Sequence, residues 1–122
     1  MIGYVTLGSN DFERSLSFYD AVLAVLGAER TFRNDHLQGY GGPGEGPMLA
    51  VAKPYDGKSA TAGNGTMVAL VAPSRDVVDK IHAAALASGG ADEGAPGLRG
   101  GTFYGAYFRD PDGNKLCAYH RG

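Results

Sequence analysis

The sequence contains a single cysteine, no tryptophan and no long apolar run. One cysteine cannot form an internal disulfide, which fits a reducing compartment. Residues 1–10 lack the basic segment and apolar core of a secretory signal. No apolar stretch approaches the roughly 20 residues that a membrane-spanning helix needs. We therefore expect a cytoplasmic protein that has no membrane partner.

Positive charge is also sparse. Lys and Arg number 11 against 13 Asp and Glu, a net charge of -2, and no stretch collects the cations. A nucleic-acid-binding protein would need a basic patch or stripe, so we expect no nucleic-acid partner. The 122 residues, 43% of them hydrophobic, are enough for one compact domain over residues 1–122.

Glycine, in contrast, is abundant, with 20 residues. No Gly-X-Y period exists, which excludes a collagen-like chain. The two main clusters, at residues 39–46 and 94–101, each follow a predicted helix. The glycines therefore indicate turns in a small folded domain.

Apolar spacing predicts two helices among several strands. Asn10, with Glu13 three residues later, forms a predicted capping box for a helix that ends near Gly27. Ser74 is the predicted cap of a second helix over residues 75–88. We expect residues 91–101 to be a loop. The predicted strands cover residues 4–7, 31–33, 37–40, 48–52, 66–72, 103–109 and 115–120.

The two halves of the chain resemble each other. Tyr-Val-Thr-Leu at 4–7 matches Met-Val-Ala-Leu at 67–70, and a capped helix that ends in glycine follows each. This repetition predicts an internal duplication of a βαβββ unit. We therefore expect an α+β fold made of two βαβββ modules, at residues 1–56 and 64–122.

Three segments in this order resemble the vicinal oxygen chelate superfamily, which includes glyoxalase I, extradiol dioxygenases, and the fosfomycin- and bleomycin-resistance proteins. They are the opening residues 2–8, the helix with Ser-Phe-Tyr at 17–19, and the closing residues 108–116, which contain the turn Asp-Pro-Asp-Gly-Asn. The resemblance implies two modules whose sheets curl into a cup. It also implies a homodimer, because relatives of this length commonly dimerise so that each pocket includes residues of both chains.

In metal-dependent members of that superfamily, the cup holds a divalent ion on His, Gln or Glu. One ligand lies near the start of each module's first strand and one on each last strand. Here these positions fall on Tyr4, Met67 and Cys117, and the fourth lies within residues 48–52, which contain no His or carboxylate. Hard cations such as Mg²⁺ need oxygen ligands. We therefore expect no metal and no other cofactor, with an unusual soft site as the alternative.

Side-chain alternation along strands predicts which residues line the cup. A five-residue hairpin loop would oppose Tyr107 to Cys117 and Arg109 to Lys115, whereas a four-residue loop would oppose Phe108 to Cys117. We favour the first register. The predicted ligand-binding residues are then Tyr4, Thr6, Met67, Tyr107, Arg109, Cys117 and Tyr119.

Other side chains carry weaker expectations. Arg109 could hold a carboxylate or phosphate, although a local ion pair with Asp110 or Asp112 is the simpler interpretation. Cys117 is expected to be buried and inert, and His82 is expected on the surface. His36 is the only histidine considered as a general base, and the catalytic residues stay unknown.

These residues favour a metal-independent protein that binds a small organic molecule, and they leave enzyme activity open. One alternative is a lactoylglutathione-lyase-like enzyme, or another lyase or isomerase, that uses a divalent metal. Another is an antibiotic-sequestering resistance protein. Bleomycin is cationic, and Arg109 and Lys115 near the pocket argue against that ligand.

Overall fold

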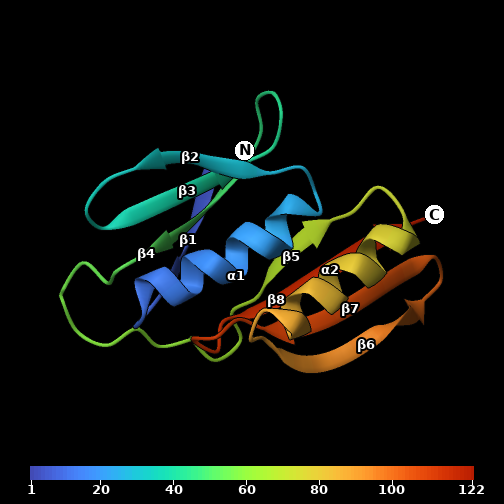
Figure 1. Ribbon diagram of the computed structural model, residues 1–122. Helices are drawn as coiled ribbons and strands as arrows, with labels where there is room; N and C mark the ends of the chain where they lie inside the picture. Colours follow the sequence, from blue (N-terminus) through green and yellow to red (C-terminus); the bar gives the residue numbers. More distant parts are fainter.

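Each half of the chain folds into a strand, a helix and three further strands in the computed structural model, which describes residues 1–122 (Figure 1). The first half contains β1 (Tyr4–Gly8), α1 (Phe12–Ala24), β2 (Glu29–Arg33), β3 (Leu37–Gly41) and β4 (Met48–Ala52). The second contains β5 (Val68–Val71), α2 (Arg75–Ala87), β6 (Ala91–Gly100), β7 (Phe103–Arg109) and β8 (Lys115–Arg121).

The two halves form separate four-stranded sheets with the same topology. The first sheet has the order β1-β4-β3-β2 and the second the order β5-β8-β7-β6. β1 is parallel to β4 and β5 is parallel to β8, and every other pair is antiparallel. The predicted α+β fold of two βαβββ modules is therefore confirmed.

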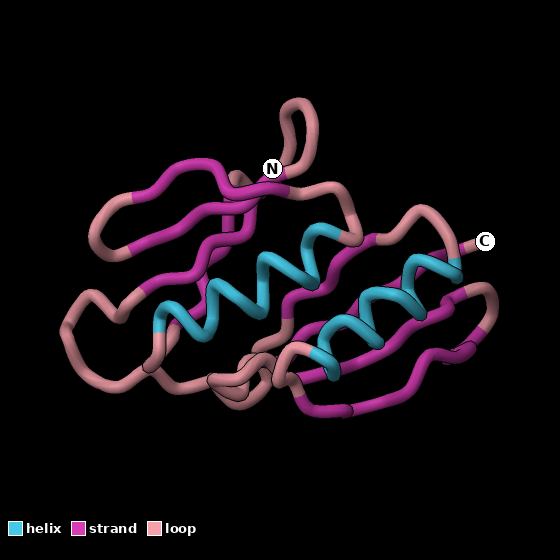
Figure 2. The backbone as a smooth tube through the Cα atoms, viewed as in Figure 1, coloured by secondary structure: helices cyan, strands magenta, loops and turns pink.

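The two helices lie side by side on the same side of the molecule, each against one face of its own sheet (Figure 2). Leu16, Phe18 and Val22 of α1 and Val78 and Ile81 of α2 belong to one buried apolar cluster. No helix or strand covers the opposite face of either sheet, which we call the open face. Neither helix is long and apolar enough to span a membrane.

The start of α1 differs from the predicted capping box. Asp11 is the N-cap, and its carboxylate accepts a hydrogen bond from Arg14 N at 3.2 Å. Asn10 instead exchanges two hydrogen bonds with the backbone of Ala60, at 2.7 and 3.1 Å, because the connector between the modules passes beside it. The predicted cap of α2 is confirmed, since Ser74 Oγ accepts from Val77 N at 3.3 Å.

The segment expected as a loop after α2 is the strand β6. It pairs with β7 through three register shifts, the first of which lies between Asp92 and Gly94. An edge strand with bulges tolerates glycine and proline, because one side of its backbone needs no partner. Composition therefore predicted a loop where the structure has an irregular edge strand.

Candidate functional site

The register of β7 and β8 places several predicted site residues on one face. Tyr107 is opposite Cys117 and Arg109 is opposite Lys115, as the five-residue hairpin loop predicts. Phe108 and Leu116, the intervening residues, are fully buried in the core on the other face. The open face of the second sheet therefore carries Tyr107, Arg109 and Cys117 together.

Aromatic rings extend this face along β7 and β8. The rings of Phe103 and Tyr119 stack with centroids 5.1 Å apart and an angle of 7° between their planes. Tyr119 is also next to Val71, its register partner on β5. The result is a flat aromatic surface on which a planar apolar ligand can pack.

The Cys117 thiol lies at the centre of this surface. Its side chain has no exposed area, and burial raises the pKa of the thiol, although the neighbouring Tyr107 hydroxyl and the cations of Arg99 and Lys115 act in the opposite direction. A raised pKa keeps the sulfur as a neutral thiol at pH 7. The expectation of a buried, unreactive cysteine agrees with this environment.

The residues predicted from the first module lie on the other sheet. Tyr4 and Thr6 are on the open face of β1, opposite Met48 and Ala50 of β4, and Tyr4 is 60% exposed. Met67 immediately precedes β5 and is 43% exposed. The two sheets are not hydrogen-bonded to each other, so one chain does not join these residues to Tyr107 and Cys117 in a continuous sheet.

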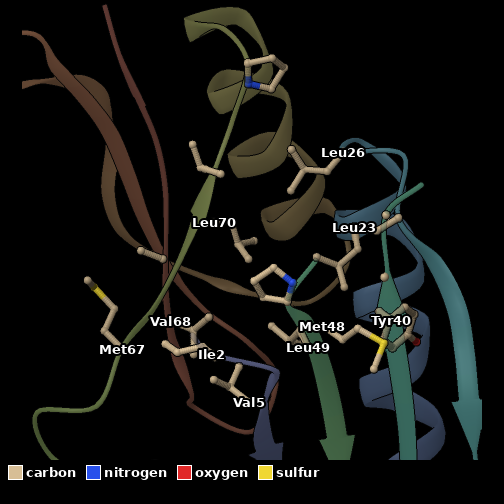
Figure 3. A pocket seen from close by; sticks show the side chains of 17 residues that line it. Ile2, Val5, Leu23, Leu26, Tyr40, Met48, Leu49, Met67, Val68 and Leu70 are labelled. Atoms are coloured by element: carbon tan, nitrogen blue, oxygen red, sulfur yellow. The ribbon is translucent and has the colours of Figure 1, made fainter. Parts of the chain in front are cut away.

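An apolar groove of about 660 Å³ separates the free edges of β1 and β5 (Figure 3). The end of α1 contributes Leu23 and Leu26, and Met67 is the only predicted site residue in its wall. No sequence signal indicated this groove, because it depends on how the two modules pack. The side chains labelled in Figure 3 are Ile2, Val5, Leu23, Leu26, Tyr40, Met48, Leu49, Met67, Val68 and Leu70.

Arg109 does form a local ion pair, but with an unexpected partner. Its Nε is 2.6 Å from Glu93 Oε1, and its Nη1 donates to Gly113 O at 3.0 Å. Glu93 belongs to β6, which the sequence did not predict as a strand. Of the two partners considered from the sequence, Asp110 instead accepts from the Tyr19 hydroxyl at 2.6 Å, and Asp112 is 3.3 Å from Arg14 Nη2.

Sequence reasoning missed Arg99 entirely. This residue of β6 places its guanidinium carbon 5.5 Å from the centroid of the Tyr107 ring. Lys115 Nζ is 5.6 Å from the same centroid. Because residues 91–101 were expected to be a loop, nothing placed Arg99 on the sheet face with Tyr107.

The histidines do not join this face. His36 lies in the turn between β2 and β3, where its backbone N–H donates to Asn34 Oδ1 at 2.8 Å. His82 was expected on the surface but is only 6% exposed. It is buried because α2 packs on the second sheet, where its Nε2 is 3.0 Å from Asp92 Oδ1. His120 pairs in register with Tyr104, and its Nδ1 is 2.9 Å from Ala72 O, so none of the three histidines lies on the face that carries Tyr107 and Cys117.

The donor set also tests whether a divalent metal fits. Thr6 pairs with Ala50 in the first sheet as Ala69 pairs with Cys117 in the second, so Ala50 is the counterpart of Cys117. The four ligand positions that the family resemblance implies are therefore Tyr4, Ala50, Met67 and Cys117. Together they supply one phenol and no carboxylate or imidazole. No group of three or more His, Cys, Asp or Glu side chains in the chain could hold a metal. These residues do not fit a hard cation, and independence from metal stays a prediction.

Comparison with known proteins defines the class. The family model of the glyoxalase/bleomycin resistance protein/dioxygenase superfamily matches residues 1–118. The chain therefore belongs to this superfamily.

The similar solved structures include a glyoxalase/bleomycin resistance protein from Albidiferax ferrireducens, 41% identical, with a TM-score of 0.91 over 100% of this chain and 99% of that one. A family enzyme from Burkholderia phytofirmans is 19% identical, with a TM-score of 0.80 over 98% of each chain. A lactoylglutathione lyase from Agrobacterium tumefaciens is 19% identical, with a TM-score of 0.70 over 98% of this chain and 92% of that one. No curated protein gave a significant match.

Proposed function

We propose that this protein binds a small organic molecule on the open face of its second sheet, without a catalytic metal. The observation that carries the proposal is the aromatic surface of Phe103, Tyr107 and Tyr119 around the buried Cys117, which no helix or strand of the chain covers. Ligand sites of this kind are mainly apolar, with a few polar groups that orient the ligand. The Tyr107 and Tyr119 hydroxyls are suited to that role.

A second copy of the chain completes the cup in this proposal. β1 and β5 each have one free edge, and unpaired strand edges are templates for pairing with another chain. Ile2, Met67 and Val71 along these edges are 54%, 43% and 66% exposed. Pairing β1 of one copy with β5 of the other would bury these apolar side chains. It would also join the two sheets, so that the open face with Tyr4 and Thr6 and the open face with Tyr107 and Cys117 line one cup.

Edge pairing has a direct test in light scattering after size-exclusion chromatography. Val71→Lys introduces a charge on the β5 edge, so we expect it to shift the homodimer toward monomer. Leu98→Lys changes a comparably exposed residue, 56% against 66% for Val71, on the opposite edge strand, and should leave the dimer intact. Equal effects of the two substitutions, or a wild-type monomer, would contradict pairing through β1 and β5.

Binding is favoured over catalysis because the one carboxylate placed on this face, Glu93, is already ion-paired with Arg109. Lyase or isomerase chemistry needs a group that removes a proton near pH 7. Burial raises the pKa of both Tyr107 and Cys117, which keeps them protonated, and His36 lies elsewhere.

Sequestration of a cationic drug such as bleomycin is disfavoured by Arg99 and Lys115 beside Tyr107. We place the protein in the cytoplasm, where Cys117 stays reduced.

A neutral fluorescent probe tests the binding proposal. N-phenyl-1-naphthylamine has an apolar body of two aromatic groups and no charge. We expect Tyr107→Leu to raise its Kd about threefold to tenfold, because the aromatic contact is lost. The matched control is Tyr55→Leu, since Tyr55 is fully exposed in the connector. Unchanged affinity in Tyr107→Leu and also in Cys117→Ala would show that the open face is the wrong site.

A further inference from the structure

We propose that the open face of the second sheet selects an organic anion, with Arg99 and Lys115 as the cations that bind it. This inference rests on the proposed function and names the class of ligand for the same site. Both cations lie within 5.6 Å of the centroid of the Tyr107 ring. A ligand that packs on Tyr107 would therefore meet two positive charges.

The glycines of β6 explain how Arg99 reaches this position. A Cβ added to Gly97 would lie 2.9 Å from Arg99 Nη1, and one added to Gly94 would lie 3.3 Å from Arg99 Nη2. The guanidinium thus occupies space that side chains at these two positions would fill. Arg99 also donates a hydrogen bond to Ala95 O, which holds it folded back along the strand toward Tyr107.

These two cations have no carboxylate partner in the chain. Neither Arg99 nor Lys115 takes part in any of the six ion pairs of the structure. The nearest acidic residue along β6 on this side, Glu93, is already 2.6 Å from Arg109. A third unpaired cation, Arg121, lies 5.6 Å from the ring centroid of Phe103. The face is therefore positive although the whole chain has a net charge of -2.

The first sheet offers no comparable charge. The open-face residues of β1 and β4 are Tyr4, Thr6, Met48 and Ala50, and the two cations of β2 are held in ion pairs, Arg30 with Asp20 and Arg33 with Glu13. An anionic group is thus attracted to the second sheet only. The apolar part of a ligand can face either of the two sheets. A guanidinium binds carboxylate, phosphate or sulfonate through paired hydrogen bonds, and an ammonium acts as a point charge. The expected ligand is a planar or apolar molecule with one such anionic group.

Two dyes with the same anilinonaphthalene body separate charge from shape. The anion is 8-anilino-1-naphthalenesulfonate and the neutral compound is N-phenyl-1-naphthylamine. We expect wild-type protein to prefer the anion, and we expect Arg99→Gln and Lys115→Gln each to raise its Kd about twofold to fivefold. The Kd of the neutral dye should change less than that of the anion in both variants. Lys80→Gln, on the exposed side of α2, is the matched control, and thermal unfolding checks that every variant is folded.

Added salt should weaken the binding of the anionic dye and not of the neutral dye, because it screens the charges of the cations. If the protein binds both dyes equally and neither Arg99→Gln nor Lys115→Gln affects the anion, the inference is wrong and the proposed function stands. If it binds neither dye, the proposed function is wrong as well.

Discussion

The hydroxyl of Tyr19 donates a 2.6 Å hydrogen bond to Oδ2 of Asp110. Tyr19 belongs to α1 of the first module, and Asp110 begins the turn between β7 and β8 of the second. Asn114, at the end of the same turn, donates from its side chain to Asp110 Oδ2 and to Gly8 O, each at 2.9 Å. The Asp-Pro-Asp-Gly-Asn turn, the most specific motif of the sequence, thus holds the two modules together.

Tyr19→Phe should destabilise the fold. The substitution keeps the buried ring and removes the donor to Asp110, which leaves a buried carboxylate with fewer partners. We expect the free energy of unfolding to fall by about 1–3 kcal/mol, measured in urea. Tyr55→Phe removes a hydroxyl from a fully exposed ring and should have no measurable effect. A loss for Tyr19→Phe no larger than that of this control would contradict the role of the bond.

The same tyrosine predicts instability in alkali. Burial, and next the negative charge of Asp110, raises the pKa of Tyr19 well above its usual value. A pKa that is higher in the folded state contributes stability that is fully present below about pH 10, the unfolded value, and is lost as the pH rises further. Wild-type stability should therefore fall above pH 10. Tyr19→Phe should show a shallower fall, and identical slopes for the two proteins would contradict the assignment.

Gly90, just after α2, is predicted to tolerate no side chain. A Cβ there would lie 2.7 Å from Arg109 O, 2.8 Å from Ala85 O and 2.9 Å from a ring carbon of Phe18. Because two of these atoms are backbone, Gly90→Ala should cost about 1–3 kcal/mol or more. Gly42→Ala is the control, since nothing lies within 4 Å of its added Cβ. Equal melting temperatures for the two variants would show that the helix end can shift freely.

Metal should not be needed for ligand binding. We expect protein purified without chelators to contain no stoichiometric metal, and we expect Ni²⁺, Zn²⁺, Mn²⁺ and Fe²⁺ to leave the Kd of N-phenyl-1-naphthylamine unchanged. The physical reason is that Tyr4, Ala50, Met67 and Cys117 occupy the positions where metal-dependent relatives have ligands. Stoichiometric metal that is lost in Tyr4→Phe or Cys117→Ala would contradict this account, and metal-dependent isomerisation of a hemithioacetal would contradict it as well.

The sequence was informative where one local pattern determines the structure. Helical spacing placed both helices, Ser74 placed the start of α2, and the five-residue turn between β7 and β8 favoured the register that puts Tyr107 opposite Cys117. It failed where tertiary contacts override local signals. Asn10 does not cap α1, because the connector passes close enough for the Asn10 side chain to bond the backbone of Ala60. β6 has the composition of a loop, yet pairing with β7 holds it as a strand.

The candidate site was predictable only in part for the same reason. Alternation along β8 put Cys117 and Tyr119 on one face, and the favoured hairpin register added Tyr107 to it. Arg99 was missed because its strand was missed. The groove beside Leu23 and Leu26 depends on the packing of α1 and the edges of β1 and β5, which no single segment of the sequence records.

The most direct test is to observe which residues respond to a ligand. Backbone amide NMR shifts, followed while N-phenyl-1-naphthylamine is added, separate the open face from the apolar groove. We expect the largest changes at Tyr107, Cys117 and Tyr119. Changes confined to Leu23, Leu26 and their neighbours in the groove would contradict this expectation.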